Sequence, residues 1–225
     1  MSDSAKKNAA LAALALIEDG MALGLGTGST TALLIEALGG KVAEGLRVTG
    51  VATSERTAKQ ARDLAIPLTT LDETPVLDLA IDGADAFDPD LNLVKGGGGA
   101  LLREKIVASC AARFVVIADA SKRVAKLGVF PLPVEVVPMA ATPIARRIGA
   151  LGAEARLRRD RFGEPFATDE GHWILDCAFG EITDPPALAQ ALQGIAGVVE
   201  HGLFIAMADE VIVGTEAGVE RLARR

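Results

Sequence analysis

The sequence predicts an α/β fold: a mostly parallel sheet with helices on both faces, and a small α/β domain inserted near its end. Three observations predict it. Helix-like and strand-like segments alternate through the first 130 residues. A polar or glycine-rich cluster follows each of several apolar strands, and the order of the segments changes after residue 130. Such alternation is typical of parallel strands joined by covering helices, with ligands bound at the carboxyl edge of the sheet.

The main domain begins with an Ala- and Leu-rich helix over 4–18 and an apolar strand over 21–25. The strands are expected where apolar and β-branched residues run together, and the helices where longer mixed segments separate them. In order, we expect a helix over 29–38, a strand over 47–52, a helix over 55–64, a short strand over 66–69, a strand over 77–81, a helix over 100–111 and a strand over 114–118. This order indicates a Rossmann-like domain.

The segments after residue 130 follow the order strand, helix, strand, strand, helix, strand, which is the ferredoxin-like arrangement. The strands are expected over 133–138, 153–158, 172–179 and 198–204, and the helices over 142–151 and 185–193. The chain then returns to the first sheet through a strand that starts at Asp209 and a short helix. We therefore predict a catalytic domain over 1–130 and 206–225, and a small domain over 131–205.

The composition excludes several classes of function. The chain has 225 residues, of which 50% are hydrophobic and 24% charged, and its formal net charge is −7. An acidic chain is a poor general partner for nucleic acid. The apolar run near the N-terminus is too short to span a membrane and lacks a cleavage signature, so we expect a cytoplasmic protein. Cys110 and Cys177 lie far apart, and we interpret both as buried small apolar residues.

The most informative segment is Lys95-Gly-Gly-Gly-Gly-Ala-Leu-Leu-Arg-Glu104. Four consecutive glycines cost conformational entropy, so they indicate a loop whose backbone N–H groups approach an anion at the start of a helix. Lys95 adds a cation, and Glu104 lies about one turn into the helix, where a carboxylate can face the same ligand. These residues indicate proton chemistry on an anionic small molecule. The alternative for Glu104 is that it only complements the helix dipole.

A second glycine-rich motif, Gly24-Leu-Gly-Thr-Gly-Ser-Thr30, follows a strand and opens a helix. It departs from the dinucleotide-binding fingerprint, because Ser29 replaces the third glycine and no acidic residue closes the next strand. We therefore expect no nicotinamide cofactor. Hydroxyl groups at a helix N-terminus suit one phosphate or sugar hydroxyls, and the alternative is that Ser29 or Thr30 caps the helix.

Two carboxylates, Asp82 and Asp85, flank Gly-Ala directly after an apolar strand. They can form a metal pair or accept hydrogen bonds from substrate hydroxyls. Because both histidines of the chain fall in the predicted small domain, we favour hydroxyl binding and predict no metal site. An ordinary Asp turn is the alternative. Lys122 follows another strand, while Lys6 and Lys7 are interpreted as the solvated side of the first helix.

Taken in order, these motifs resemble ribose-5-phosphate isomerases of type A, over nearly the whole chain. Besides the two glycine-rich motifs above and Asp82-Gly-Ala-Asp85, the resemblance rests on Ala118-Asp-Ala-Ser-Lys122, Phe130-Pro-Leu-Pro-Val-Glu-Val, Gly197-Val-Val-Glu-His-Gly-Leu-Phe204 and the late strand at Ala208-Asp209. The departures are minor: Gly214-Thr-Glu-Ala-Gly lacks the Pro-Asp often found in that turn. One such motif is weak evidence, whereas the ordered series is specific.

The resemblance implies that Glu104 is the catalytic base, with Asp82, Asp85 and Lys95 assisting. It also implies that the substrate contacts Thr27, Gly28, Ser29, Thr30, Asp82, Gly83, Ala84, Asp85, Lys95, Gly96, Gly97, Gly98 and Lys122. Members of the family need no metal and no organic cofactor. They assemble as homodimers or homotetramers, and their partner is a small sugar phosphate.

The implied reaction interconverts D-ribose 5-phosphate and D-ribulose 5-phosphate in the non-oxidative pentose phosphate pathway, through a cis-enediolate. Ser29, Thr30 and Lys122 are the candidates to hold the phosphate, with Lys6 or Lys7 as less favoured alternatives. Two other classes stay open. One is a sugar-phosphate sensor, which should carry a DNA-binding module for which this acidic chain has little room. The other is a transferase that forms an acyl intermediate on a glutamate, which a thioester substrate would reveal.

Overall fold

The structure, a computed structural model, describes residues 3–224 and divides into two compact units. Among these residues, the first unit comprises 3–84, 103–123 and 207–224. The second unit comprises Asp85–Leu102 and Val124–Ala206. This division differs from the predicted boundaries chiefly in one segment, because 85–102 groups with the second unit and not with the main domain.

The first unit contains a six-stranded sheet in the order β13-β12-β6-β3-β1-β2. All neighbours are parallel except the antiparallel pair β12–β13. The strands are β1 (Ala22–Leu25), β2 (Thr49–Ala52), β3 (Leu79–Asp82), β6 (Phe114–Asp119), β12 (Glu210–Thr215) and β13 (Gly218–Ala223). The mostly parallel sheet that the sequence predicts is therefore confirmed.

Two predicted elements of this unit are wrong. The segment after residue 214 is strand β13 and not a short helix. Pairing with the edge of β12 gives its backbone groups partners, which a single turn of helix would leave largely unsatisfied. The short strand expected over 66–69 is reduced to an isolated bridge between Leu68 and Gly50.

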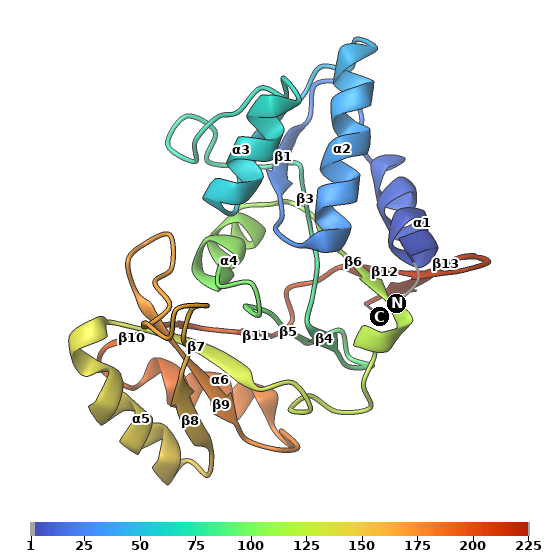
Figure 1. Cartoon of the computed structure of the whole chain (residues 1–225). Helices are drawn as coiled ribbons and strands as arrows, with labels where there is room; N and C mark the ends of the chain where they lie inside the picture. The colour runs from blue at the N-terminus through green and yellow to red at the C-terminus, as the bar shows by residue number, and fades with distance from the viewer. Residues whose placement is uncertain (1–2, 225) are drawn as a thin grey trace. The chain divides into compact units, whose positions relative to one another are not determined.

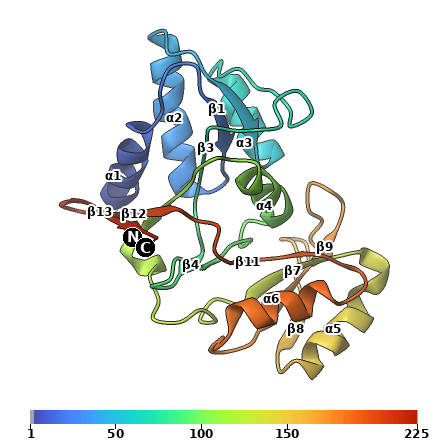
Figure 2. The ribbon, with the colours of Figure 1, turned by 180° about the vertical axis from the view of Figure 1, so that it is seen from behind.

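Helices pack on both faces of this sheet, as predicted (Figures 1 and 2). They are α1 (Asp3–Leu14), α2 (Ser29–Ala43), α3 (Glu55–Asp63) and α4 (Leu101–Ser109). Leu23 and Leu25 of β1 share one buried core with Leu34 of α2. Gly24 lies between them on β1, so it faces the opposite side, where a Cβ atom would lie 2.6 Å from Val107 of α4.

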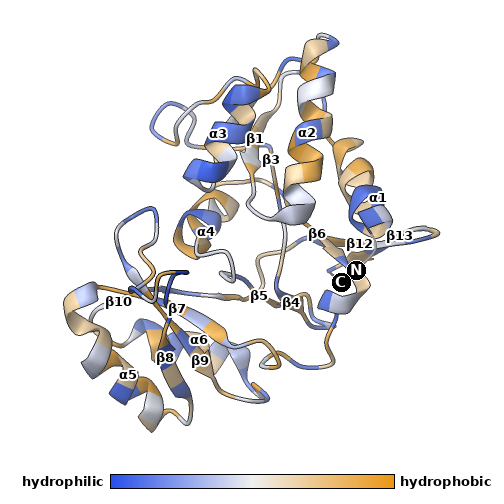
Figure 3. Ribbon diagram, in the orientation of Figure 1, coloured by the Kyte–Doolittle hydropathy of each residue, from blue (hydrophilic) through white to orange (hydrophobic). Residues whose placement is uncertain are grey.

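The ends of the helices follow from local chemistry. Ser54 caps α3, because its Oγ accepts a hydrogen bond from the Thr57 N–H at 3.1 Å. Figure 3 shows α3 as largely hydrophilic and α2 as more hydrophobic, in keeping with the deeper burial of α2. α1 and α2 lie side by side, and α1 also contacts β6 and β12.

The second unit contains a four-stranded antiparallel sheet in the order β10-β7-β9-β8. Its strands are β7 (Leu132–Val136), β8 (Glu154–Leu157), β9 (Trp173–Ala178) and β10 (Val198–His201), and its helices are α5 (Ala141–Ala150) and α6 (Pro185–Gln193). The predicted order of strands and helices is confirmed. Val134, Ile144 and Leu192 join the sheet and both helices in one buried core.

A three-stranded sheet in the order β11-β5-β4 was not predicted. The single strand expected over 198–204 is divided, with 198–201 in β10 and 203–204 in β11 of this other sheet. Its strands, β4 (Ala86–Phe87), β5 (Leu93–Val94) and β11 (Leu203–Phe204), have two residues each. Two residues are too few to establish an alternating pattern. This sheet matters for function, because Asp85 precedes β4 and Lys95 follows β5.

Candidate active site

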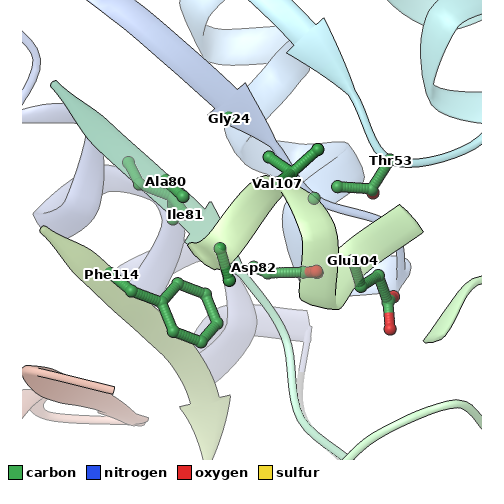
Figure 4. Close-up of a pocket in the computed structure, with 10 residues that line it drawn as sticks. Gly24, Thr53, Ala80, Ile81, Asp82, Glu104, Val107 and Phe114 are labelled. Atoms are coloured by element: carbon green, nitrogen blue, oxygen red, sulfur yellow. The ribbon is translucent and has the colours of Figure 1, made fainter. Parts of the chain in front are cut away.

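Two buried carboxylates, Asp82 and Glu104, line one recess of the first unit (Figure 4). Asp82 is the last residue of β3, and Glu104 lies in the first turn of α4. The two residues are 3% and 5% exposed. The space in the recess that is open to a water-sized group is about 0 Å³, far below the roughly 300 Å³ at which ligand pockets usually begin. The recess therefore seats the two carboxylates and does not by itself hold a sugar phosphate.

Asp82 fixes the turn that links β1 to α2. Its Oδ1 accepts hydrogen bonds from the Thr27 N–H at 2.9 Å and from the Gly83 N–H at 2.7 Å. The bond from Gly83 is a local contact with the next residue, whereas the bond from Thr27 joins two strand ends that are far apart in sequence. Gly26 passes so close that a Cβ atom there would lie 2.3 Å from Asp82 Oδ1. The close approach requires glycine at this position.

The hydroxyl of Thr27 belongs to a buried cluster that sequence reasoning missed. Its Oγ1 lies 2.8 Å from Thr53 Oγ1, 2.7 Å from Ser54 Oγ and 3.0 Å from Thr57 Oγ1. In the sequence, residues 53 and 54 served only as evidence against a dinucleotide-binding site, because neither residue is acidic. The cluster holds the ends of β1 and β2 together, and it occupies the Thr27 side chain that we expected to contact substrate.

The N-terminus of α2 is open to an anion. Gly28 is the N-cap residue, with φ of 142°, and it provides no side-chain cap. Neither Ser29 nor Thr30 caps the helix, which removes the alternative weighed for them. Lys6 of α1 donates a hydrogen bond from Nζ to Ser29 Oγ at 2.9 Å. A cation, a hydroxyl and uncapped N–H groups meet at this helix end, a combination that suits a phosphate.

In the second unit, Lys95 directly precedes the glycine loop, and Asp85 binds one of the middle residues of the loop. The Lys95 N–H donates to Gly202 O at 2.9 Å, and its Nζ lies 5.5 Å from the centre of the Phe204 ring. Lys95 is only 2% exposed. Asp85 Oδ2 accepts a hydrogen bond from the Gly97 N–H at 2.7 Å. A hydrogen bond thus links the Asp85 carboxylate to the backbone of the glycine loop.

The four glycines have different roles. Gly96 and Gly99 have φ of 106° and 81°, a conformation that other residues rarely adopt. Gly99 also faces Phe166, whose ring would lie 2.5 Å from an added Cβ atom. Gly97 and Gly98 are exposed. The first and last glycines therefore shape the loop, and the middle two present their backbone outward.

The predicted site residues divide between the two units. The first unit brings Thr27, Asp82 and Glu104 together, and it holds Lys122 at the end of the 3-10 turn η1 (Ala120–Lys122). The second unit brings Asp85 together with Gly97 and carries Lys95. Sequence reasoning missed Arg158, one of several arginines over 156–161, whose guanidinium contacts the glycine loop.

Other features of the described chain bear on chemistry. Within residues 3–224, no three His, Cys, Asp or Glu side chains are grouped as a metal site, and no helix is long and apolar enough to cross a membrane. Cys177 is buried, and burial raises the pKa of its thiol to about 12. Cys110 is half-buried, so our expectation of full burial is wrong there. A hollow of about 460 Å³ beside α3 contains no predicted site residue.

Known proteins share both the sequence and the fold. The family model Ribose 5-phosphate isomerase A (phosphoriboisomerase A) matches residues 49–218. Over 225 aligned residues, 97% of each chain, the sequence is 55% identical to ribose-5-phosphate isomerase A of Parvibaculum lavamentivorans. The chain belongs to the ribose 5-phosphate isomerase A family.

Solved structures agree with this assignment. Ribose 5-phosphate isomerase A from Methanocaldococcus jannaschii superimposes with a TM-score of 0.95 at 44% identity, over 99% of this chain and 100% of that one. A D-ribose-5-phosphate isomerase solved in complex with phospho-erythronic acid gives a TM-score of 0.96 at 43% identity, over 100% of both chains. The predicted family and the prediction of an isomerase are confirmed. The homo-oligomer and the cytoplasmic location stay predictions.

Proposed function

We propose that this member of the ribose 5-phosphate isomerase A family interconverts D-ribose 5-phosphate and D-ribulose 5-phosphate through a cis-enediolate, with Glu104 as the base. Membership of the family supports the reaction. The observation that carries the mechanism is the buried Glu104 carboxylate, which shares a recess with Asp82 at the carboxyl edge of the sheet. Open α/β sheets bind their ligands at that edge.

Glu104 takes the proton from C2 of the open-chain aldose and returns it to C1. The C–H bond next to a carbonyl is only weakly acidic, so the base must be held within reach of it. The first turn of α4 holds Glu104, and burial limits its motion. A positioned general base typically contributes about 10²- to 10⁴-fold in rate.

The enediolate carries a negative charge that needs donors fixed in advance. Lys95 supplies a cation, and the outward N–H groups of the glycine loop supply neutral donors. Asp82 and Asp85 accept hydrogen bonds from sugar hydroxyls and assist ring opening. One relative in the family was solved with phospho-erythronic acid, a phosphorylated sugar acid whose carboxylate carries negative charge as an enediolate does.

The phosphate of the substrate binds at the N-terminus of α2. The uncapped N–H groups of Ser29 and Thr30 favour an anion there, and Lys6 adds a positive charge at a hydrogen-bond distance of 2.9 Å from Ser29 Oγ. Lys122 is a second cation of the same unit. The reading of Lys6 as a merely solvated residue gives way in this proposal to a role in phosphate binding.

The test is proton NMR of ribose 5-phosphate in D₂O with chelator-treated protein. We expect wild type to form ribulose 5-phosphate with deuterium at the exchanged carbon. Glu104→Gln should bind substrate and fold normally but turn over at least about 100-fold more slowly. Glu36→Gln, at an exposed glutamate of α2, is the matched control and should keep wild-type activity. Wild-type turnover in Glu104→Gln would remove the base from the mechanism.

The same experiment separates the other classes of function. Line broadening of the sugar phosphate without conversion would favour a sensor. Accumulation of an acyl-enzyme with a thioester substrate would favour a transferase. Neither outcome is expected for a family of isomerases.

A further inference from the structure

We propose that Arg158 is a positioning residue for the isomerase reaction: it fixes two peptide groups of the glycine loop so that the Gly98 N–H is held outward as a donor. The inference rests on the proposed role of this loop in stabilising the enediolate. It concerns residues of the second unit alone.

Arg158 is anchored on several sides. It directly follows β8, and its own N–H donates to Ile174 O of β9 at 2.8 Å. Its guanidinium forms a two-pronged ion pair with Asp176 of β9, with Nε 3.0 Å from Oδ2 and Nη2 bonded to Oδ1. The guanidinium also lies 5.8 Å from the centre of the Phe166 ring. The Arg158 side chain is only 13% exposed, so its remaining edge has a fixed direction.

That remaining edge holds the glycine loop by its carbonyl groups. Arg158 Nη1 donates to Gly96 O at 2.8 Å and to Gly97 O at 3.2 Å. Among residues 3–224 there is no cis peptide bond, and in a trans peptide the C=O and the following N–H point in opposite directions. The N–H groups of Gly97 and Gly98 are therefore turned away from Arg158.

The Gly97 N–H, which points away from Arg158, donates a hydrogen bond to Asp85 Oδ2 at 2.7 Å. The Gly98 N–H has no hydrogen-bond partner among residues 3–224, and no atom lies within 4 Å of the site of a Cβ atom on Gly98. The exposed Gly98 thus carries a donor that is one residue from the Gly97 N–H bound to Asp85. A donor of this kind suits the oxygen of a developing enediolate.

The loop needs an external clamp because glycine has the widest backbone freedom of any residue. Without Arg158, each of the two peptide groups can rotate and carry its N–H out of position. A donor that must be ordered during the reaction stabilises the transition state less than one fixed beforehand. Lysine cannot replace Arg158. A single ammonium group cannot bind both oxygens of Asp176 and at the same time donate to the two loop carbonyls.

The test compares Arg158→Ala and Arg158→Lys with Arg156→Ala as the matched control. Arg156 lies on β8, two residues before Arg158, and its side chain is 77% exposed and paired with Glu154. We expect both Arg158 variants to lose about 10- to 100-fold in kcat with a smaller change in KM. Arg156→Ala should keep the wild-type constants. Millimolar guanidinium chloride should restore part of the activity of Arg158→Ala, whereas sodium chloride should not.

A merely structural role predicts other results. If Arg158→Ala loses activity only in proportion to its unfolded fraction, measured by circular dichroism, or if guanidinium restores nothing, the proposal is overturned. Wild-type kcat in both Arg158 variants would overturn it as well. Failure of the proposed mechanism is distinguishable, because an active Glu104→Gln variant removes the base and leaves the effect of Arg158 on kcat to be measured separately.

Discussion

Gly26 provides the sharpest test of how the first unit holds its site. Replacement by alanine would place a Cβ atom 2.3 Å from Asp82 Oδ1 and 2.6 Å from Asp82 Cα, whereas ordinary contact begins at 3.4 Å. The Asp82 side chain can rotate, but its Cα belongs to the backbone of β3. The ends of β1 and β3 must therefore separate by roughly 1 Å.

The cost has two parts. Overpacking of a closely packed site typically costs about 1–3 kcal/mol. A hydrogen bond to a charged group is worth about 1.5–3 kcal/mol, and the bond from the Thr27 N–H to Asp82 is strained by the same movement. The lower chain entropy of alanine in the unfolded state returns less than about 1 kcal/mol. We expect Gly26→Ala to lower the free energy of unfolding by about 2–5 kcal/mol.

The assay is thermal and urea unfolding followed by circular dichroism, with isomerase activity measured on the same samples. For a chain of this size the expected loss lowers Tm by roughly 4–20 °C. Activity per folded molecule should also fall, because Asp82 shares its recess with Glu104. Gly40→Ala in α2 is the control: no atom lies within 4 Å of its added Cβ, so it should stabilise the chain by about 1 kcal/mol. A Gly26→Ala variant as stable as wild type would refute the reasoning.

Two further predictions concern other groups. Burial raises the pKa of Glu135 above its ordinary 4.5, despite hydrogen bonds from Thr168 and His172 to its Oε1. The contribution of Glu135 to stability is therefore greatest below pH 4.5 and is lost as the pH rises through the folded pKa. Denaturation at several pH values should show that the free energy of unfolding of Glu135→Gln rises relative to that of wild type as the pH rises. A relative free energy of unfolding that falls with pH would contradict this. Lys6→Met should raise the KM for ribose 5-phosphate about tenfold with little change in kcat, whereas the exposed neighbour Lys7→Met should not, and equal KM values for both variants would remove Lys6 from the phosphate site.

Much of the fold could be predicted because it depends on local pattern. Apolar runs such as 114–118 became strands, and the order of segments after residue 130 gave the ferredoxin-like arrangement correctly. The prediction failed where an element is too short to carry a pattern. The two-residue strands β4, β5 and β11 are defined by their pairing with one another, and β11 pairs with β5 from more than 100 residues further along the chain.

The candidate site was predicted in part for the same reason. The glycine loop and Glu104 are contiguous in sequence, so their relation could be inferred from spacing. The partner of Ser29 is Lys6, 23 residues away, and the partners of the loop carbonyls lie about 60 residues away on Arg158. Nothing in a run of surface-like arginines distinguishes the one that packing turns toward the loop.

The sequence by itself determined the chemistry available to this protein: a carboxylate in a first helical turn, a glycine loop, a helix N-terminus without a dinucleotide fingerprint, and the family that combines them. The tertiary structure alone decided what each group is bonded to. One oxygen of Asp82 accepts hydrogen bonds from two backbone N–H groups, and the Thr27 hydroxyl forms hydrogen bonds within a buried cluster. Side-chain type fixes which bonds a residue can make, whereas packing brings the partners within reach, because hydrogen bonds act over only about 3 Å.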